Sequence, residues 1–260
     1  MIKWRTRIHA LNILRLVILD APLSAEMKPF IGDSLISALI GYSDTSWAVR
    51  NSSTMTFSAI MLRVVDADKN AGGKMKGIRR EVGVSAITAT ELFRSYPSLA
   101  ISLLSLMKEE TGEVVTNRLH PALFPLLLLL SRLQPISMSR IDPRADDISG
   151  MLIAPVLNCL GHPHHKVRLV ASRALAVLCS GDDENSVQKN NSRRALIEQC
   201  VCLLSESLCR SQKSNNQDHG LLLALYELLK ECSTPAMYFS ASMKEILSYY
   251  GSWGFFKGKF

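Results

Sequence analysis

The chain has 260 residues, enough to bury a sizeable core, and its 47% hydrophobic and 20% charged residues exclude a predominantly disordered protein. Aromatic residues make up only 7%, and leucine is abundant, which argues against an all-β barrel and favours helices. The formal net charge of +7 is compatible with RNA, an acidic protein or a membrane surface as partner and does not decide among them.

Apolar residues recur at helical spacing in successive blocks, separated by short polar or proline-marked breaks. Strand-like alternation is scarce, so the pattern predicts an all-α protein. The predicted helices lie, in chain order, near residues 5–19, 27–42, 46–65, 88–107, 118–133, 148–161, 164–180, 192–210, 217–232 and 235–250.

The first block follows several basic residues and loosely resembles a mitochondrial presequence. Asn12 and Arg15 interrupt its apolar run, and no clear cleavage site follows, so a folded amphipathic helix is favoured. Because this helix begins almost at Met1 without a polar cap, we expect the chain to start inside a longer helical stack.

Two helices share a pattern that indicates a repeat. Val49-Arg50 and Val167-Arg168 each open a helix, and each pair is followed at matching positions by a small residue and by large apolar residues. The two copies are 118 residues apart, close to three units of a HEAT or armadillo repeat of ~40–47 residues. In a stack of such helix pairs, the arginine can reach a carboxylate or carbonyl of the neighbouring repeat. The predicted architecture is therefore an α-solenoid of HEAT/armadillo-like repeats over residues 1–250.

Three segments interrupt the helical rhythm. A flexible basic loop is predicted over 66–87, a polar loop over 181–191, and an extended connection over 134–147. Residues 251–260 match no repeat pattern. The longest apolar run, 126–130, is far shorter than the ~20 residues of a membrane span, so we expect no membrane association.

No residue pattern predicts an active site, a metal or a cofactor. The six cysteines include no pair with the spacing of a metal knuckle, which is typical of a reducing compartment and favours a cytoplasmic protein. The histidines at 162, 164 and 165 lie in a proline-containing turn that predicts a solvated loop rather than a metal site. Gly72-Gly73-Lys74 lacks the ending of a phosphate-binding loop. We therefore expect a protein that is not an enzyme.

One basic stretch is the better RNA candidate. Flexible lysines and arginines reach phosphates with little stereochemical demand, and no aromatic residue lies among them to stack on a base, so the contact would be to the RNA backbone. The candidate residues are Lys69, Lys74, Lys76, Arg79 and Arg80.

Short motifs that follow one another in the same order over residues 7–230 resemble the thyroid adenoma-associated (THADA) family. The most characteristic is Trp47-Ala48-Val49-Arg50-Asn51-Ser52, which opens a helix in that family. The other matching segments are His9–Leu14, Leu92–Leu99, His120–Pro125, Ser131–Leu133, Lys166–Arg168, Ala171–Leu175 and His219–Leu223.

The resemblance implies a non-catalytic adaptor of an S-adenosylmethionine-dependent tRNA ribose 2'-O-methyltransferase that acts on position 32 of the anticodon loop. The cofactor and the chemistry would belong to that partner, and tRNA itself is a second candidate partner. Family members are much longer, and their Arg-Arg-Ser-Ala-Gly-Leu-Pro stretch lies upstream of the segment that resembles His9–Leu14, so a truncated inactive product is one alternative. A HEAT-type interaction scaffold without an RNA role is the other. The candidates for contacts between repeats or with a partner are Trp47, Arg50, Asn51, Arg168, Arg173 and His219, and contacts between repeats are favoured for the arginines.

Overall fold

A computed structural model describes residues 4–24, 26–65, 87–111, 121–133, 143–179, 187–209 and 215–230. Within these ranges all regular elements are helical, so the all-α prediction is confirmed. In chain order the elements are α1 (Trp4–Leu19), α2 (Ala21–Ser24), the 3-10 helix η1 (Lys28–Phe30), α3 (Ile31–Gly41), α4 (Trp47–Ile60), the π-helix η2 (Met61–Val65), α5 (Ala89–Ser95), α6 (Pro97–Thr111), α7 (Leu123–Arg132), α8 (Pro143–Asn158), the 3-10 helix η4 (Cys159–Gly161), α9 (His165–Cys179), α10 (Val187–Cys209) and α11 (Asn215–Lys230).

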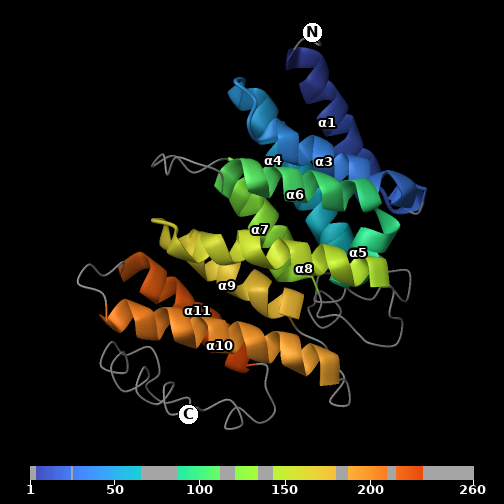
Figure 1. Ribbon diagram of the computed structural model, residues 1–260. Helices are drawn as coiled ribbons and strands as arrows, with labels where there is room; N and C mark the ends of the chain where they lie inside the picture. The colour runs from blue at the N-terminus through green and yellow to red at the C-terminus, as the bar shows by residue number, and fades with distance from the viewer. Residues whose placement is uncertain are drawn as a thin grey trace, which may run out of the picture.

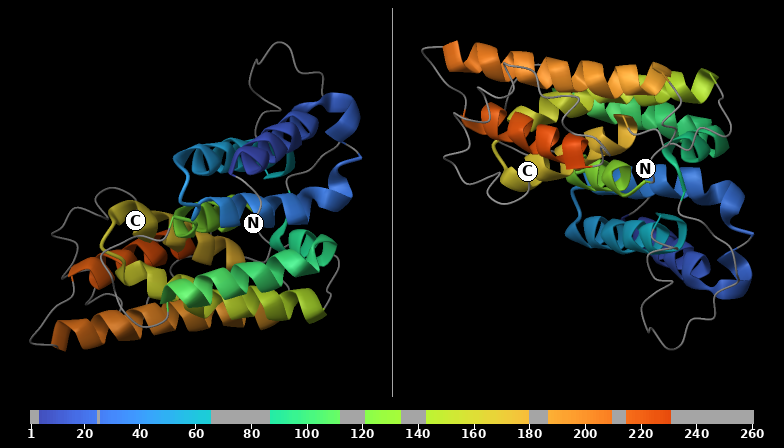
Figure 2. Two further views of the ribbon diagram at one scale, coloured as in Figure 1. Left: turned by 90° about the horizontal axis from the view of Figure 1, so that it is seen from above. Right: turned by 90° about the horizontal axis from the view of Figure 1, so that it is seen from below.

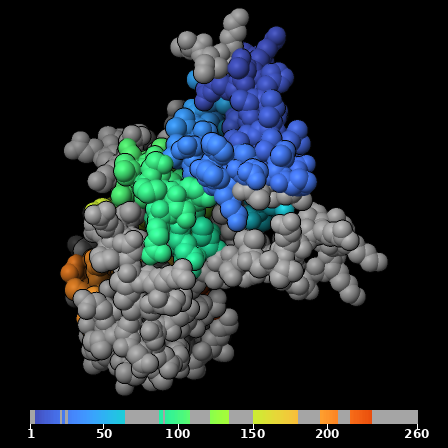
Figure 3. Space-filling view, turned by 90° about the vertical axis from the view of Figure 1, so that its right-hand side faces the viewer, coloured from blue at the N-terminus to red at the C-terminus, as the bar shows by residue number. Residues whose placement is uncertain are grey.

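The helices pair along the chain, and the pairs stack in two rows (Figures 1 and 2). Each pair joins a first-row helix to a second-row helix: α3 packs on α4, α6 on α7, α8 on α9, and α10 on α11. Within the second row, α1 packs on α4, α7 packs on η2 and α9, and α9 packs on α11. Within the first row, α6 contacts both α3 and α8. The space-filling view shows α5 and α6, in green, against the blue N-terminal helices, below them and to their left (Figure 3). The predicted α-solenoid is confirmed.

The spacing of the two Val-Arg helices differs from the prediction. Among the described helices, α7 is the only second-row helix between α4 and α9, so these helices place the two copies two repeats apart and not three. The additional short helix α5 lies between the α3–α4 pair and the α6–α7 pair and lengthens that repeat beyond a standard HEAT unit.

The break between α5 and α6 was not predicted, because periodicity alone indicated one helix over 88–107. Tyr96 has φ −134° and ψ 73°, and it precedes Pro97, whose ring disfavours helical backbone at the residue before it. The Tyr96 hydroxyl donates a hydrogen bond of 2.7 Å to the carbonyl oxygen of Lys28, just before α3. The break therefore lets the Tyr96 side chain join α5–α6 to the preceding repeat.

Two predicted connections are partly helical. The extended connection predicted over 134–147 is wrong from Pro143 onward, because α8 begins there with proline in the first turn, where its missing N–H costs nothing. The polar loop predicted over 181–191 is wrong from Val187 onward, where α10 begins. The rest of these two segments, residues 66–86 of the basic loop, the predicted helix 235–250 and the segment 251–260 lie outside the described residues.

One continuous apolar core runs along the stack and draws on α1 at one end and α11 at the other. At the α9–α11 end, the backbones approach closely: a Cβ added at Gly220 would lie 2.0 Å from the carbonyl oxygen of Leu160. Cys159, Cys179 and Cys200 are buried thiols in this core, and burial, with a smaller contribution from Cys179, raises the pKa of Cys200 to about 12. None of the helices in the described ranges is long and apolar enough to cross a bilayer.

Candidate functional site

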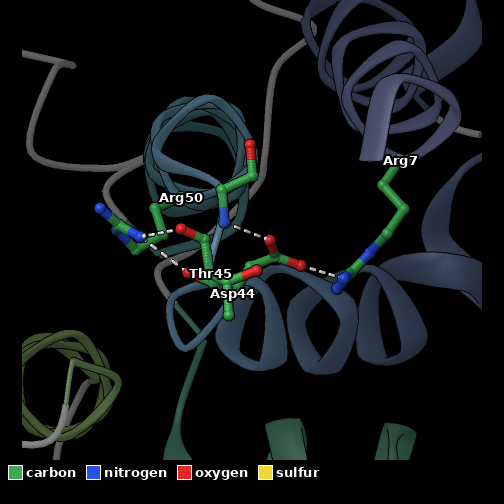
Figure 4. A network of polar contacts seen from close by, with 5 residues as sticks. Arg7, Asp44, Thr45 and Arg50 are labelled. Carbon is green, nitrogen blue, oxygen red and sulfur yellow. Dashed lines mark hydrogen bonds and ion pairs between the residues drawn. The ribbon is translucent and has the colours of Figure 1, made fainter. Parts of the chain in front are cut away.

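The turn between α3 and α4 is tied together by Arg50, in the first turn of α4 (Figure 4). One guanidinium nitrogen, Nη1, donates hydrogen bonds to the carbonyl oxygens of Asp44 (2.8 Å) and Thr45 (3.0 Å). Backbone carbonyls in such a turn have no partner within the helices, and a charged donor satisfies two of them at once. Arg50 therefore fixes the geometry of its own turn.

Asp44 connects the same turn to α1. Its Oδ1 accepts a hydrogen bond of 2.7 Å from the backbone N–H of Ser46, the residue before α4. Its Oδ2 forms an ion pair with Arg7 of α1 (Figure 4). The Asp44 carboxylate, Arg7 and Arg50 thus hold together α1, the α3–α4 turn and the start of α4.

Arg168 repeats the Arg50 arrangement two repeats along the stack. Its Nη1 donates to the carbonyl oxygens of His162 (2.7 Å) and Pro163 (2.8 Å), which stand six and five residues before it, as Asp44 and Thr45 stand before Arg50. The shared Val-Arg pattern therefore marks an arginine that donates to two carbonyl oxygens of the turn before its own helix. The carbonyls belong to the arginine's own repeat, which differs from the expected contact with carbonyls of the neighbouring repeat.

Arg168 also reaches the next repeat, through side chains of α11. Its Nη1 donates to Oδ1 of Asn216 (3.0 Å), and its Nε donates to Nδ1 of His219 (3.2 Å). Accepting at Nδ1 requires a neutral imidazole, which then carries its proton on Nε2. Arg168 is only 7% exposed, so these bonds are made away from water, where they are stronger.

Imidazole rings surround this arginine. His165 and His219 meet edge to face with ring centroids 5.1 Å apart, and His162 and His164 stack at 5.3 Å. Burial, Arg168 and His165 lower the pKa of His219, and burial, His164 and Arg168 lower the pKa of His162. The lowered pKa values favour the neutral form of both imidazoles. No group of three or more His, Cys, Asp or Glu side chains suited to a metal ion occurs in the described part of the chain.

Of the remaining candidate residues, Arg173 makes a contact between repeats, whereas Trp47 and Asn51 are exposed. Nε of Arg173 in α9 lies 3.3 Å from Oε1 of Glu227 in α11, which makes a second polar link across that junction. Trp47 is 70% exposed at the start of α4, and Asn51 is exposed one turn later. These two side chains are available to a partner.

The structure brings Arg168, Arg173 and His219 together at the α9–α11 junction and places Trp47, Arg50 and Asn51 at the far end of the stack. The RNA candidates Lys69, Lys74, Lys76, Arg79 and Arg80 lie outside the described residues.

Sequence reasoning missed four residues that take part in these contacts, which are Arg7, Asp44, Asn216 and Glu227. Asp44 stands in the polar turn that precedes the Val-Arg pattern, and this position was the available signal. The others are separated from their partners by 37 residues or more, a distance over which no local pattern extends.

Comparison with family models matches nearly the whole described chain. Residues 50–228 match the model described as Trm732, C-terminal TPR repeats, and residues 2–48 match the model described as THADA/TRM732, DUF2428. The first match spans most of the stacked helix pairs, including α9 and all of α4 from Arg50 onward.

Three curated relatives are all named as tRNA (32-2'-O)-methyltransferase regulators. Proteins named tRNA (32-2'-O)-methyltransferase regulator THADA from Gallus gallus and Homo sapiens are 31% and 30% identical over 86% and 87% of this chain. The tRNA (32-2'-O)-methyltransferase regulator trm732 of Schizosaccharomyces pombe is 24% identical over 49% of it. The chain spans 11% of the length of the first two relatives and 8% of the third. No solved structure matches.

Proposed function

Because the chain belongs to the THADA/Trm732 family, we propose that it acts in the regulation of a tRNA ribose 2'-O-methyltransferase, as a non-catalytic adaptor. The observation that carries the proposal is the match, along 86% of the chain, to proteins named as regulators of methylation at tRNA position 32. The methyl donor, S-adenosylmethionine, and the chemistry would belong to the partner enzyme.

The arrangement of the polar side chains supports a role in holding other molecules. Arg50 donates to turn carbonyls, Arg168 donates to turn carbonyls and to side chains of α11, and Arg173 lies against Glu227. These groups therefore stabilise the stack itself. A rigid two-row stack presents long surfaces on which a partner can be positioned, as other helical-repeat proteins do.

The basic segment with Lys69, Lys74, Lys76, Arg79 and Arg80 is our candidate for contacts with the tRNA backbone. Five positive side chains within a short stretch give strong and non-specific attraction to phosphates. We further propose a cytoplasmic protein, since the buried thiols Cys159, Cys179 and Cys200 fit a reducing compartment.

Co-purification tests the proposal. The tagged chain is expressed in cells, with a helical-repeat protein of similar size and net charge as the control bait, and bound proteins are identified by mass spectrometry. We expect the chain, and not the control, to recover a 2'-O-methyltransferase, and we expect deletion of the coding segment to lower ribose methylation at tRNA position 32. Recovery of no methyltransferase together with unchanged methylation at position 32 would reject the adaptor role.

A further inference from the structure

The second-row helices begin at one edge of the stack, which we call the amino-terminal edge. It is defined by six exposed side chains, Trp4, Arg5, Trp47, His164, His165 and Lys166. In Figure 1 the N-terminal ends of α4, α9 and α11 all lie toward the left of the stack.

Hydrogen bonds show that α1 and α4 run side by side in the same direction. Arg7 near the start of α1 pairs with Asp44 in the turn before α4, and Thr56 Oγ1 in the middle of α4 donates to the Leu11 carbonyl (2.9 Å). Past the end of α4, Arg63 in η2 donates to the carbonyl oxygen of Leu19, at the end of α1. The two helices therefore begin at the same level, and so their first residues, Trp4 and Trp47, belong to one edge.

Both indoles are open to solvent. Trp47 is 70% exposed and Trp4 is 49% exposed. The guanidinium of Arg5 lies 5.2 Å from the centre of the Trp4 ring, as in a cation–π pair. An exposed indole beside a guanidinium offers a flat face for a base and a positive charge for a phosphate.

The charge at this edge is unusual for helix N-terminal ends, where carboxylates are normally stabilising. The first turns of α1, α4, α7 and α9 contain no acidic residue. Of the described acidic residues near the edge, Asp44 is paired with Arg7, and Asp218 of α11 is 2% exposed. The turn carbonyls, which would otherwise add negative potential, face Arg50 and Arg168.

We propose that the amino-terminal edge binds a single-stranded segment of RNA, with bases stacked on Trp4 and Trp47 and phosphates near Arg5 and Lys166. This inference rests on the proposed function, because a regulator of tRNA methylation works beside a tRNA whose anticodon loop is unpaired. Trp47 begins α4 and Val65 ends η2, so the edge and the last described residue before the basic segment are about 28 Å apart along the helix axis at 1.5 Å per residue. Exposed aromatic groups at this edge add base stacking, which the basic segment cannot supply.

The test measures RNA binding by the purified chain without any methyltransferase, so that its result does not depend on partner capture. The probe is a fluorescently labelled anticodon stem-loop RNA, compared with a fully paired RNA duplex of the same length. The variants are Trp4→Ala, Trp47→Ala and Lys166→Glu. The matched controls are Met151→Ala in α8 and Ile101→Ala in α6, which are 50% and 70% exposed on first-row helices.

We expect each tryptophan variant to lose about tenfold in affinity for the stem-loop and little for the duplex, because stacking needs an unpaired base. Trp47→Ala should also remove part of the indole fluorescence quenching that stacked RNA causes. Lys166→Glu should lower the salt dependence of binding, and the two controls should bind as the parent chain does.

Two results would overturn the inference. One is that Trp4→Ala and Trp47→Ala, shown to be folded by circular dichroism, bind the stem-loop as tightly as the parent chain. The other is that these variants keep RNA affinity and instead fail to capture the methyltransferase, which would make the edge a protein interface. Failure of the adaptor proposal alone would leave the RNA affinities, and their decrease on substitution, unaffected.

Discussion

Replacing Arg168 with methionine, which has a similar length and no charge, should loosen the junction between α9 and α11. The change removes hydrogen bonds to two turn carbonyls and to Asn216 and His219, all from a side chain that is almost fully buried. Each hydrogen bond from a charged group contributes about 1.5–3 kcal/mol when measured alone, but bonds from one guanidinium are not additive. We therefore expect a loss of about 3–5 kcal/mol in the free energy of unfolding of this region, as for other broken buried networks.

Arg50→Met is the matched control because Arg50 makes the same two turn bonds, and both of them stay within its own repeat. Arg50 is also only partly buried, so its replacement should cost about 1–2 kcal/mol. Hydrogen–deuterium exchange is the suitable assay, since repeat stacks open locally and a single unfolding midpoint would mix the regions. Arg168→Met should speed exchange in both α9 and α11, whereas Arg50→Met should affect the α3–α4 turn. Unchanged protection of α11 in the Arg168 variant, or equal losses in the two variants, would refute the reasoning.

Three further predictions concern the glycine contact, pH and the basic segment. Gly220→Ala should destabilise the chain by about 1–3 kcal/mol because its Cβ would collide with the Leu160 carbonyl. Gly150→Ala should be neutral or stabilising by about 0.5–1 kcal/mol, because a Cβ at Gly150 would meet no atom outside its own stretch of helix within 4 Å. Thermal unfolding of both variants checks the opposite signs. The pKa of His219 is lowered by burial, Arg168 and His165, so its contribution to stability is complete above the unfolded value of about 6.5 and is lost as pH falls through the lower folded value. Urea midpoints should thus fall on acidification, and less steeply in His219→Gln; a midpoint that rises would contradict this. Replacing Lys74, Lys76, Arg79 and Arg80 with glutamate should weaken tRNA binding. It should also reduce the slope of log affinity against log salt concentration, by about 0.7–0.9 for each phosphate that is no longer neutralised. Unchanged affinity in a filter-binding assay would exclude the basic segment as an RNA-binding element.

Sequence reasoning succeeded where the physics is local. Helical periodicity located the described helices because burial of one helix face imposes a spacing of three and four residues. The Val-Arg pattern marked two equivalent helix starts because both arginines serve the turns directly before them, five and six residues away.

It failed where the determining contact is distant or lies in the backbone. The spacing of Val49 and Val167 suggested three repeats where the described helices show two, because an additional helix such as α5 cannot be read from a fixed period. The acceptors of Arg50 are carbonyl groups, which every residue carries, so no side-chain pattern identifies them. The contacts of Arg168 with Asn216 and His219 depend on how α11 stacks, which only the assembled structure shows.

We propose that this chain holds other molecules in place and that a partner enzyme transfers the methyl group. The most direct test of this proposal is a methyl-transfer assay with isotope-labelled S-adenosylmethionine and unmodified tRNA, run with the chain alone, the co-purified methyltransferase alone, and both together. The account predicts no transfer by the chain alone and a higher rate at ribose 32 when both proteins are present. Methyl transfer by the purified chain in the absence of any other protein would contradict it.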